Sequence, residues 1–310
     1  MSQTNKVNNF FKDSIDVKGR FIRKDAAFRN QISETHEIYK PETGRYHLYV
    51  GLFCPWACRT LIVRALKGLE DVIDVSIVDY FLGPNGCQFS EREGSTVDRV
   101  NGFEYLRSVY FATSPGYTGR YTVPVLFDKK TNTIVNNESS EIIRMFNTVF
   151  NKWAKNPEGN FYPEELRTKI DAVNEWVYPM INNGVYRAGF STTQEAYEEA
   201  YHDVFNGLDR VEDILSKQKY LVGDTFTEAD IRLFTTLIRF DAVYFVHFKC
   251  NKKLLRDYPN VSKYTREIYH MPGVKDTVNF HHIKHHYFES HTQINPYGIT
   301  PLGPNLDYLN

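Results

Sequence analysis

Apolar and polar side chains follow two different periods along this chain, and the change of period predicts two unlike halves. Residues 46–53 alternate as a β-strand does, and residues 72–78 form a second run of strand length. Pro55 suits the first position of a helix, and apolar residues then recur on one helical face at Cys58, Leu61, Ile62, Ala65 and Leu66. Gly68 is expected to end this helix. A strand, a helix and a strand within about 30 residues predict a βαβ unit with a parallel pair.

The next region combines a long polar segment with a predicted hairpin. Residues 79–120 are polar and glycine-rich, and they are too long for an ordinary connection, so we expect a functional insertion there. The pattern then predicts strands at 123–127 and 133–136 with a turn at 128–132. Pro124 falls inside the first of these strands, so we expect a sheet edge, a bulge or a cis peptide bond at this position.

Helical spacing replaces strand patterns in the rest of the chain. Ser139 or Ser140 is expected to cap the helix that follows the hairpin, and from about residue 162 the pattern is helical almost to the end. Thr227 to Asp230 resembles a capping box before another apolar helix. The apolar positions at helical spacing include Leu166, Ile170, Val173, Val177, Tyr197, Ala200, Tyr201, Val204, Phe205, Leu208, Val211 and Leu215.

These patterns predict an α/β domain followed by an all-α domain. We expect a polar, extended arm at residues 1–45 and the α/β domain at 46–150. The character of the sequence changes at 151–161, and we expect the all-helical domain at 162–310, with an irregular tail from 288 onward.

Composition narrows the classes of function. A net charge of −1 lacks the basic field that binding to nucleic acid or to a membrane surface needs, so we expect neither partner. No apolar run reaches the length of a membrane span, and the first residues lack the apolar core of a signal peptide. We therefore expect a cytoplasmic protein. Its four cysteines are too few for a disulfide framework, and in a reducing compartment a conspicuous cysteine is more often catalytic.

One cysteine is placed for reactivity in the stretch FCPWACR. Cys54 directly precedes Pro55, so it lies where a helix begins, and the free N–H groups and positive dipole end there stabilise a thiolate. The alternative is an inert, buried cysteine at the end of a strand. Cys58 lies on the apolar face and is expected in the core, although a transient disulfide with Cys54 stays open. Arg59 and Arg64 are expected to be ordinary solvated residues of the helix.

A cluster of histidines near the C-terminus has a spacing that is compatible with metal binding. His281, His282, His285 and His286 contain two pairs separated by four residues. No acidic or cysteine partner follows at a telling interval, so we expect no metal site there and a packed or solvated helix instead.

Several long stretches resemble the glutathione transferases, and most closely the glutathionyl-hydroquinone reductases, which form the xi class or omega-like group of fungi and bacteria. They occur in the family's order across most of residues 46–301. The stretches are CPWACRTLIVRALKGLE, PGYTGRYTVPVLFDKKTNTIVNNESSEIIRMFN, NNGVYRAG, RFDAVYFVHFKCN and HIKHHYFESHTQINPYGITP. The resemblance implies a thioredoxin-like N-terminal domain with a cis Pro124, an all-α C-terminal domain, and a homodimer.

The resemblance also implies an activity and a set of site residues. Glutathione is the implied co-substrate, and aromatic glutathione conjugates are reduced to hydroquinones through a mixed disulfide on Cys54. The implied catalytic residues are Cys54, Tyr186, Tyr244 and Tyr287. The implied glutathione-binding residues are Arg120, Tyr121, Thr122, Val123, Pro124, Glu138, Ser139 and Cys87.

Two departures from the family pattern put substrate preference in doubt. Cys87 stands where the family has a tryptophan that packs on glutathione, and Cys58 stands where the family commonly has histidine. Cys87 is therefore also a candidate for a second redox-active thiol. Two alternatives stay open: an omega-like thioltransferase or dehydroascorbate reductase that also uses Cys54, and a non-catalytic, transferase-like binding domain. The presence of Cys54, Glu138, Ser139 and the three tyrosines together argues against the second.

Overall fold

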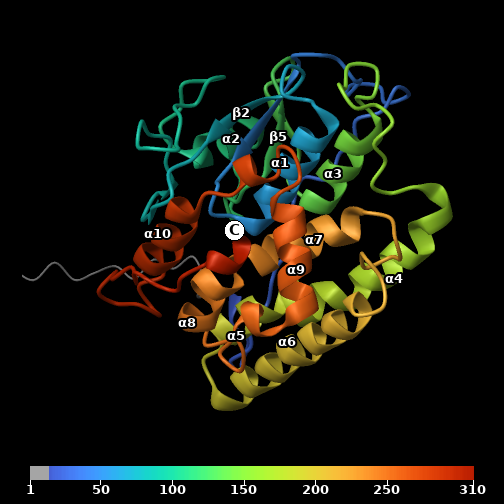
Figure 1. Cartoon of the computed structure of the whole chain (residues 1–310). Coiled ribbons are helices and arrows are strands. Elements are labelled where there is room, and N and C mark those ends of the chain that lie inside the picture. Colours follow the sequence, from blue (N-terminus) through green and yellow to red (C-terminus); the bar gives the residue numbers. More distant parts are fainter. Residues whose placement is uncertain (1–13) are drawn as a thin grey trace, which may run out of the picture.

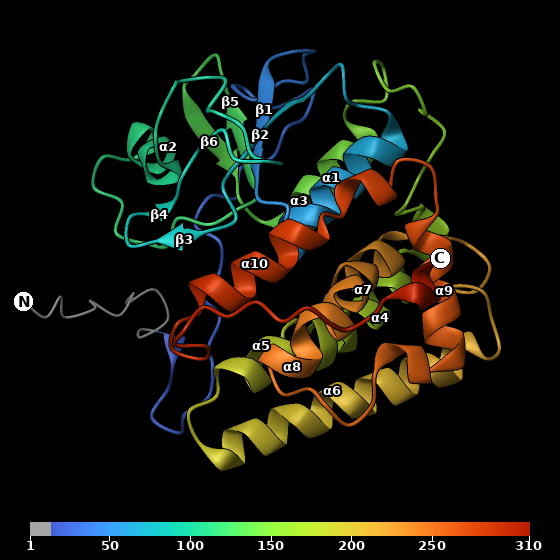
Figure 2. The same ribbon diagram turned by 60° about the vertical axis from the view of Figure 1, so that its left-hand side comes forward.

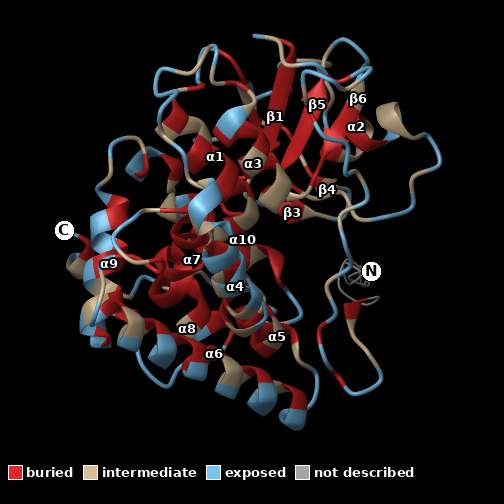
Figure 3. Ribbon diagram, turned by 90° about the vertical axis from the view of Figure 1, so that its right-hand side faces the viewer, coloured by how far each residue is buried: buried red, intermediate tan, exposed pale blue. Residues whose placement is uncertain are grey.

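The computed structural model describes residues 14–310 of the chain and consists of a sheet-containing half and a helical half (Figure 1). Part of the expected N-terminal arm, residues 1–13, lies outside the described residues. Residues 14–45 contain no long helix or strand and run beside both halves. Buried apolar residues form one continuous cluster that joins the sheet to the helices (Figure 3).

The central sheet has four strands in the order β2-β1-β5-β6. β1 (Tyr46–Val50) pairs in parallel with β2 (Asp74–Ile77) and antiparallel with β5 (Val125–Asp128), and β5 pairs antiparallel with β6 (Thr133–Asn136). The predicted βαβ unit and hairpin are therefore confirmed, with shorter strands than expected. The Val123–Pro124 peptide bond is cis and lies directly before β5, so Pro124 leaves the hydrogen bonds of the strand intact.

Helices cover both faces of this sheet (Figure 2). α1 (Pro55–Lys67) and α3 (Ser139–Thr148) pack together on one face, and α2 (Leu106–Thr113) packs near β6 on the other. Every residue of β1 is buried for this reason. α1 ends as predicted, because Gly68 adopts the left-handed conformation with φ +63°.

The segment between β2 and β5 has secondary structure of its own. It contains a short hairpin, β3 (Leu82–Gly83) and β4 (Gly86–Cys87), before α2. The buried Asp98 carboxylate holds the loop between β4 and α2. It accepts hydrogen bonds from the Tyr49 hydroxyl at 2.9 Å and from the Val100 amide at 3.0 Å. This segment is therefore attached to the sheet and not a free loop.

The second half is helical throughout, as the sequence predicts. Its α-helices are α4 (Arg167–Val177), α5 (Gly184–Phe190), α6 (Gln194–Leu215), α7 (Glu228–Arg239), α8 (Phe245–His247), α9 (Pro259–Tyr269) and α10 (Phe280–Ser290). Two π-helical turns, Tyr178–Asn182 and Phe240–Tyr244, connect these helices, and single 3₁₀ turns lie at Glu164–Leu166, Leu255–Asp257, Lys275–Thr277 and Asp307–Leu309.

Two helices of this half, α7 and α10, pack against the sheet-containing half. α7 begins at the predicted capping box, in which the Thr227 hydroxyl and the Asp230 carboxylate satisfy each other's backbone N–H groups. α7 packs against α1, and α10 lies close to β3 and to the Phe240–Tyr244 turn. Among residues 14–310, no helix combines the length and apolar character that crossing a membrane requires.

Candidate active site

A cavity of about 540 Å³ lies between the two halves, and we call it the Cys54 cavity. Its size is within the usual range for small-molecule sites. Its wall is formed by the N-terminal arm, the start of α1, the segment before β5, the start of α3 and parts of the helical half. The sequence-predicted residues that line it are Cys54, Cys87, Arg120, Tyr121, Thr122, Val123, Pro124, Glu138, Ser139, Tyr186 and Tyr287.

Cys54 occupies the N-cap position of α1, as predicted. The residue is 7% exposed, and its thiol donates a hydrogen bond to the Val123 carbonyl oxygen at 3.4 Å. Burial raises the pKa of Cys54, and the N–H groups of Ala57 and Trp56 together with the charge of Arg239 offset only part of this effect. The expected stabilisation by the helix end is therefore present, but desolvation outweighs it.

The other cysteines play different parts. Cys58 is fully buried on the core side of α1, where its sulfur lies 3.7 Å from the Thr277 carbonyl oxygen. It is a free thiol, as are the remaining three cysteines. Cys87 lines the cavity from β4, and burial followed by the neighbouring Cys54 raises the pKa of Cys87 to about 12. Cys87 therefore forms a neutral part of the wall at physiological pH.

An extended backbone segment forms one side of the cavity. The Tyr110 hydroxyl donates to the Thr122 carbonyl at 2.7 Å and accepts from the Thr122 amide at 3.1 Å. Val123 and the cis Pro124 follow, and they bring the Val123 carbonyl to Cys54. A backbone held in this way can pair with an extended peptide.

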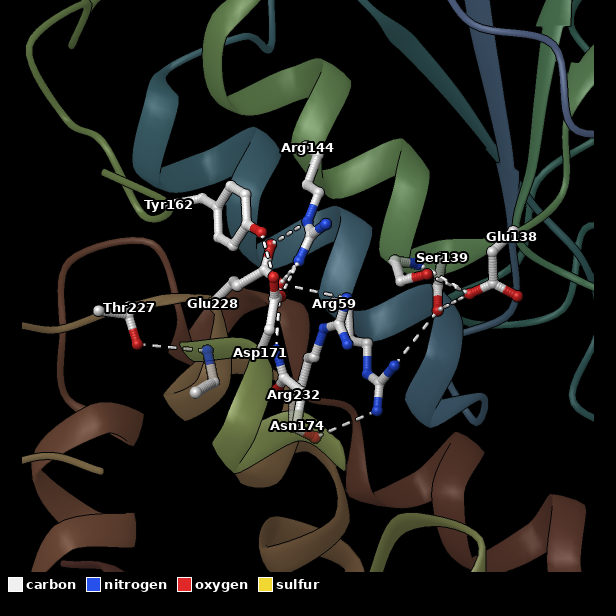
Figure 4. A network of polar contacts seen from close by, with 12 residues as sticks. Arg59, Glu138, Ser139, Arg144, Tyr162, Asp171, Asn174, Thr227, Glu228 and Arg232 are labelled. Carbon is white, nitrogen blue, oxygen red and sulfur yellow. Dashed lines mark hydrogen bonds and ion pairs between the residues drawn. The ribbon is translucent and has the colours of Figure 1, made fainter. Parts of the chain in front are cut away.

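The start of α3 differs from the prediction, because neither Ser139 nor Ser140 caps the helix. Glu138 is the N-cap residue, and its carboxylate accepts hydrogen bonds from the Ser140 amide at 2.9 Å and hydroxyl at 2.8 Å. A carboxylate side chain reaches back to the free N–H groups more strongly than a hydroxyl. Ser139 is left with its hydroxyl between Glu138 and Arg59, at 3.4 Å from each (Figure 4).

The expectation that Arg59 is solvated is wrong. Arg59 is 2% exposed because α1 packs against α7, and its guanidinium donates to Asn182 Oδ1 at 3.0 Å. Burial, followed by the nearby Arg232, lowers the pKa of Arg59 to about 9. Arg64 is half-buried and donates to the Ile73 carbonyl oxygen at 2.7 Å, so it too is less solvated than expected.

Figure 4 shows that a network of charged groups continues from this point into the helical half. Arg144 of α3 donates to Glu228 of α7 at 2.8 Å and to Asp171 of α4 at 2.7 Å. Arg232 forms a second ion pair with Glu228 at 3.2 Å. These contacts hold α3 against both helices, so they fix the place of Glu138 and Ser139 in the cavity.

Three tyrosines from distant elements meet at the opposite end. Tyr186 of α5 and Tyr287 of α10 line the cavity with their hydroxyls hydrogen-bonded to each other. Tyr244 is fully buried behind them and does not line the cavity, and its hydroxyl lies 3.1 Å from that of Tyr287. Burial raises the pKa of all three phenols, so they are neutral at physiological pH and can donate protons.

Of the four histidines in the cluster, only His286 lines the Cys54 cavity. The His286 ring stacks on Phe53 with 3.6 Å between centroids, and its Nδ1 donates to the Tyr80 carbonyl at 2.6 Å. Burial lowers the pKa of His286 to about 4. His282 donates to the Glu93 carbonyl at 2.7 Å, and His285 pairs with Glu289. Across residues 14–310, no group of three or more metal-ligating side chains comes together.

Sequence reasoning missed the contribution of the N-terminal arm. Phe21 and Arg23 line the cavity, and the Arg23 guanidinium lies 4.8 Å from the Tyr186 ring and 5.0 Å from the Trp56 ring. Its Nε donates to Asn183 at 2.8 Å. The arm carries no periodic pattern, so only the three-dimensional structure reveals this role.

Comparison with protein families gives two matches within the described chain. Residues 53–149 match the model of the glutathione S-transferase N-terminal domain, and residues 194–267 match that of the C-terminal domain. The first range contains Cys54, the cis Pro124 and the start of α3. The second contains Tyr244.

Similar proteins cover nearly the whole chain. The chain is 51% identical to glutathionyl-hydroquinone reductase YqjG of Escherichia coli, over 95% of this chain and 92% of that protein. It is also 51% identical to glutathione S-transferase omega-like 2 of Schizosaccharomyces pombe, over 97% and 99%.

Solved structures agree with these matches. The Xi glutathione transferase of Phanerochaete chrysosporium superimposes with a TM-score of 0.91 at 54% identity, over 93% of this chain and 98% of that one. The glutathione-bound structure of YqjG superimposes with a TM-score of 0.89 at 52% identity, over 92% and 94%. The fold is therefore that of a glutathione transferase, as the sequence predicts. The chain belongs to the glutathione S-transferase family, in the group that contains the Xi-class transferases and the glutathionyl-hydroquinone reductases.

Proposed function

We propose that this protein is a glutathionyl-hydroquinone reductase that uses Cys54 as its nucleophile. The observation that carries this proposal is the shared cavity, in which the Cys54 thiol and the neutral hydroxyls of Tyr186 and Tyr287 line one space. A thiol nucleophile and buried proton donors are the two groups that cleavage of an aromatic carbon–sulfur bond requires. The similarity to YqjG and to its glutathione-bound structure supports the same function.

In this proposal, glutathione binds along the wall opposite the tyrosines. The backbone of Val123, held beside the cis Pro124, pairs with the cysteinyl part as a short added strand. The start of α3 receives the γ-glutamyl end: the helix N-terminus and the Ser139 hydroxyl take its carboxylate, and Glu138 takes its ammonium group. Arg120, Tyr121, Thr122 and Cys87 complete the binding site.

The aromatic ring of the conjugate lies at the tyrosine end. The Cys54 thiolate attacks the glutathione sulfur, and a sulfur–sulfur bond forms as the carbon–sulfur bond breaks. The electron pair leaves with the ring carbon, which is feasible when the ring is held as its keto tautomer. A tyrosine hydroxyl delivers the proton that this carbon takes up, and the hydroxyl cluster stabilises the phenolate or enolate oxygen. The ring is thereby reduced by two electrons, and the two sulfurs are oxidised to a mixed disulfide.

A second glutathione restores the thiol. Its thiolate attacks the glutathione sulfur of the mixed disulfide, Cys54 leaves as the thiolate, and glutathione disulfide is released. The sum is one glutathionyl-hydroquinone and one glutathione converted to one hydroquinone and one glutathione disulfide. No second protein cysteine takes part.

The test is release of hydroquinone from a glutathionyl-hydroquinone in the presence of glutathione. We expect wild type to be active and Cys54→Ser and Cys54→Ala to lose at least about 1000-fold of the rate, because each lacks the nucleophile. Cys250→Ala is the matched control, since Cys250 is equally buried but does not line the cavity. Full activity in Cys54→Ser would disprove the role of Cys54 and favour a non-catalytic cysteine.

An omega-like thioltransferase is the second candidate function. The reason to test it is Cys87, a neutral thiol in the cavity wall at a position where the family resemblance implies a tryptophan. That enzyme reduces small glutathione disulfides or dehydroascorbate through Cys54. The 7% exposure of Cys54 favours small substrates over glutathionylated proteins. Wild type that reduces a glutathione mixed disulfide but leaves the glutathionyl-hydroquinone intact would establish this alternative.

We also propose that the protein forms a homodimer. Light scattering on the purified protein tests this proposal.

A further inference from the structure

Arg239, the last residue of α7, is a fully buried cation next to the loop that carries Cys54. Its guanidinium donates three hydrogen bonds to backbone carbonyls: Nε to Phe53 at 3.1 Å, Nη2 to Leu52 at 3.1 Å and Nη1 to Thr235 at 2.8 Å. Two of these acceptors are the residues directly before Cys54. Arg239 therefore joins the helical half to the start of α1.

Arg239 lacks a carboxylate partner such as the one that the buried Arg45 has in Asp128, at 2.6 Å. No carboxylate among residues 14–310 forms an ion pair with Arg239, and its acceptors are neutral carbonyls. A buried charge without a counter-charge is costly, so a function that needs the charge is expected to maintain it.

Arg239 faces the Cys58 thiol in the core, and it also faces groups of the site that acquire negative charge by reaction. Its charge acts on Cys54, and on Tyr244 and Tyr287, in the direction that lowers the pKa of each. It also acts against protonation of His286, whose pKa is lowered mainly by burial. The positive charge therefore acts both on the nucleophile and on two of the phenols.

We propose that Arg239 is a positioning residue for the Cys54 reaction: it holds the Leu52 and Phe53 carbonyls in place and supplies the counter-charge for the Cys54 thiolate. The proposal rests on the proposed function, because Cys54 must act as a thiolate. Before attack, the proton of Cys54 leaves to solvent and the charge stays on sulfur. A counter-charge at Arg239 raises the fraction of protein in that state without contacting the substrate.

Other groups also face Cys54, and their effects on its ionisation must be distinguished from the effect of Arg239. Arg23 contributes a second positive charge from the arm, and the N–H groups of α1 contribute dipoles. Cys87 and Tyr186 face Cys54 from β4 and α5 as neutral groups. Substitution of Arg239 alone leaves all of these in place, so its effect on the ionisation of Cys54 can be measured by itself.

The test measures the rate of Cys54 alkylation by iodoacetamide as a function of pH. The other three cysteines are left unchanged, and mass spectrometry identifies the alkylated residue. We expect Arg239→Gln to shift the apparent pKa of Cys54 upward by about one unit or more, which lowers the alkylation rate at pH 7 about tenfold. Arg239→Lys, which keeps the charge, is expected to recover most of this loss. Arg64→Gln is the matched control, because Arg64 of α1 also donates to backbone carbonyls, at Ile73 and Glu70, but its charge is not among those that act on the pKa of Cys54.

Alkylation needs no substrate, so the result is separate from that of the hydroquinone assay. An unchanged pKa of Cys54 in folded Arg239→Gln, or an equal shift in Arg64→Gln, would overturn the proposal and leave Arg239 with a purely structural role. If Arg239→Gln does not fold, Cys54→Asp and Cys54→Asn test the counter-charge with Arg239 intact. We then expect the difference in melting temperature between Cys54→Asp and Cys54→Asn to stay the same as the pH rises from 4 to 7. A fall in the melting temperature of Cys54→Asp alone would overturn the proposal.

Discussion

The two ends of the Cys54 cavity are built in opposite ways. The polar end comes from residues 120–139, one short segment that runs through the cis Pro124 and the hairpin to the start of α3. The aromatic end is assembled from three elements of the helical half, and its two hydrogen-bonded tyrosines, Tyr186 and Tyr287, are 101 residues apart in sequence. Cys54 lies between the ends, at the start of α1. Local structure therefore forms the first end, whereas only tertiary packing forms the second.

This difference predicts a division of labour that kinetics can test. Backbone amides, hydroxyls and a helix N-terminus at the polar end suit binding of glutathione in every state of the reaction, so their loss should raise KM. Neutral, buried hydroxyls at the aromatic end suit proton transfer, which occurs only in the transition state, so their loss should lower kcat. A variant at one end that produced the effect assigned to the other would break the comparison.

Tyr287→Phe is expected to have the largest effect of the substitutions at either end. The Tyr287 hydroxyl contacts the hydroxyls of both Tyr186 and Tyr244, so its removal breaks the whole cluster. We expect kcat for a glutathionyl-hydroquinone to fall roughly 100-fold or more, with little change in KM for glutathione. Steady-state kinetics with both substrates varied measures the two constants.

A second substrate separates proton transfer from damage to the fold. Reduction of a small glutathione disulfide needs Cys54 but no protonation of carbon, so Tyr287→Phe should keep most of this activity. Tyr244→Phe is the matched control, because its hydroxyl lies behind the cavity and its loss should cost less. Equal losses on both substrates in Tyr287→Phe would mean that the tyrosine cluster only supports the structure.

Acid should weaken the aromatic end before the polar end. Burial lowers the pKa of His286 to about 4 and that of His247 to about 3, whereas an unfolded histidine titrates near pH 6.5. The folded state therefore binds fewer protons, so stability is complete above about pH 6.5 and is lost as the pH falls toward 4. For His286 alone the loss is about 3 kcal/mol when the shift is fully expressed. Urea unfolding between pH 7.5 and 4.5 measures the free energy of unfolding.

The matched variant for this prediction is His286→Asn, which retains a side-chain donor near the Tyr80 carbonyl but has no charge to gain. Its free energy of unfolding should be lower than that of wild type at pH 7.5 and should fall less steeply on acidification. If both proteins show the same slope against pH, protonation of His286 does not contribute to acid unfolding.

The same contrast explains which features the sequence could predict. The βαβ unit, the hairpin, the end of α1 at Gly68 and the capping box of α7 follow from local patterns, and the structure contains all of them. Motif resemblance was needed to select Tyr186, Tyr244 and Tyr287 among 21 tyrosines, because no local pattern distinguishes a hydroxyl that meets two others.

The failures have physical causes of the same kind. Arg59 was expected to contact solvent, but α7 of the helical half packs against α1, and helical spacing alone cannot show what packs against a helix. The N-cap role passed from the serines to Glu138 because its longer side chain reaches the Ser140 amide. The arm contributes Phe21 and Arg23 through contacts that leave no periodic signal.

At the polar end, Ser139→Ala should have a moderate effect, confined to binding. Ser139 lines the cavity and its hydroxyl lies 3.4 Å from both Glu138 and Arg59, so it is placed to donate a hydrogen bond to a glutathione carboxylate. Loss of one such hydrogen bond should raise KM for glutathione about three- to tenfold and leave kcat within about twofold. Ser140→Ala is the matched control, since Ser140 also contacts Glu138 but does not line the cavity. A fall in kcat with unchanged KM would contradict the division between the two ends.

Cys87→Ala should have the smallest effect. It tests whether the Cys87 thiol, in the cavity wall, takes part in the reaction. Because the pKa of Cys87 is raised to about 12, less than about one thiol in ten thousand is ionised at pH 7, too few to compete with free glutathione for the Cys54 mixed disulfide. We expect kcat/KM to change by no more than about threefold. Intact-mass measurement after treatment with glutathione disulfide should find the same stable glutathionyl adduct in both proteins. Spontaneous loss of the adduct from wild type but not from Cys87→Ala would instead show a Cys54–Cys87 disulfide and make Cys87 a reactant, because only an attack by the Cys87 sulfur can release glutathione without a second thiol.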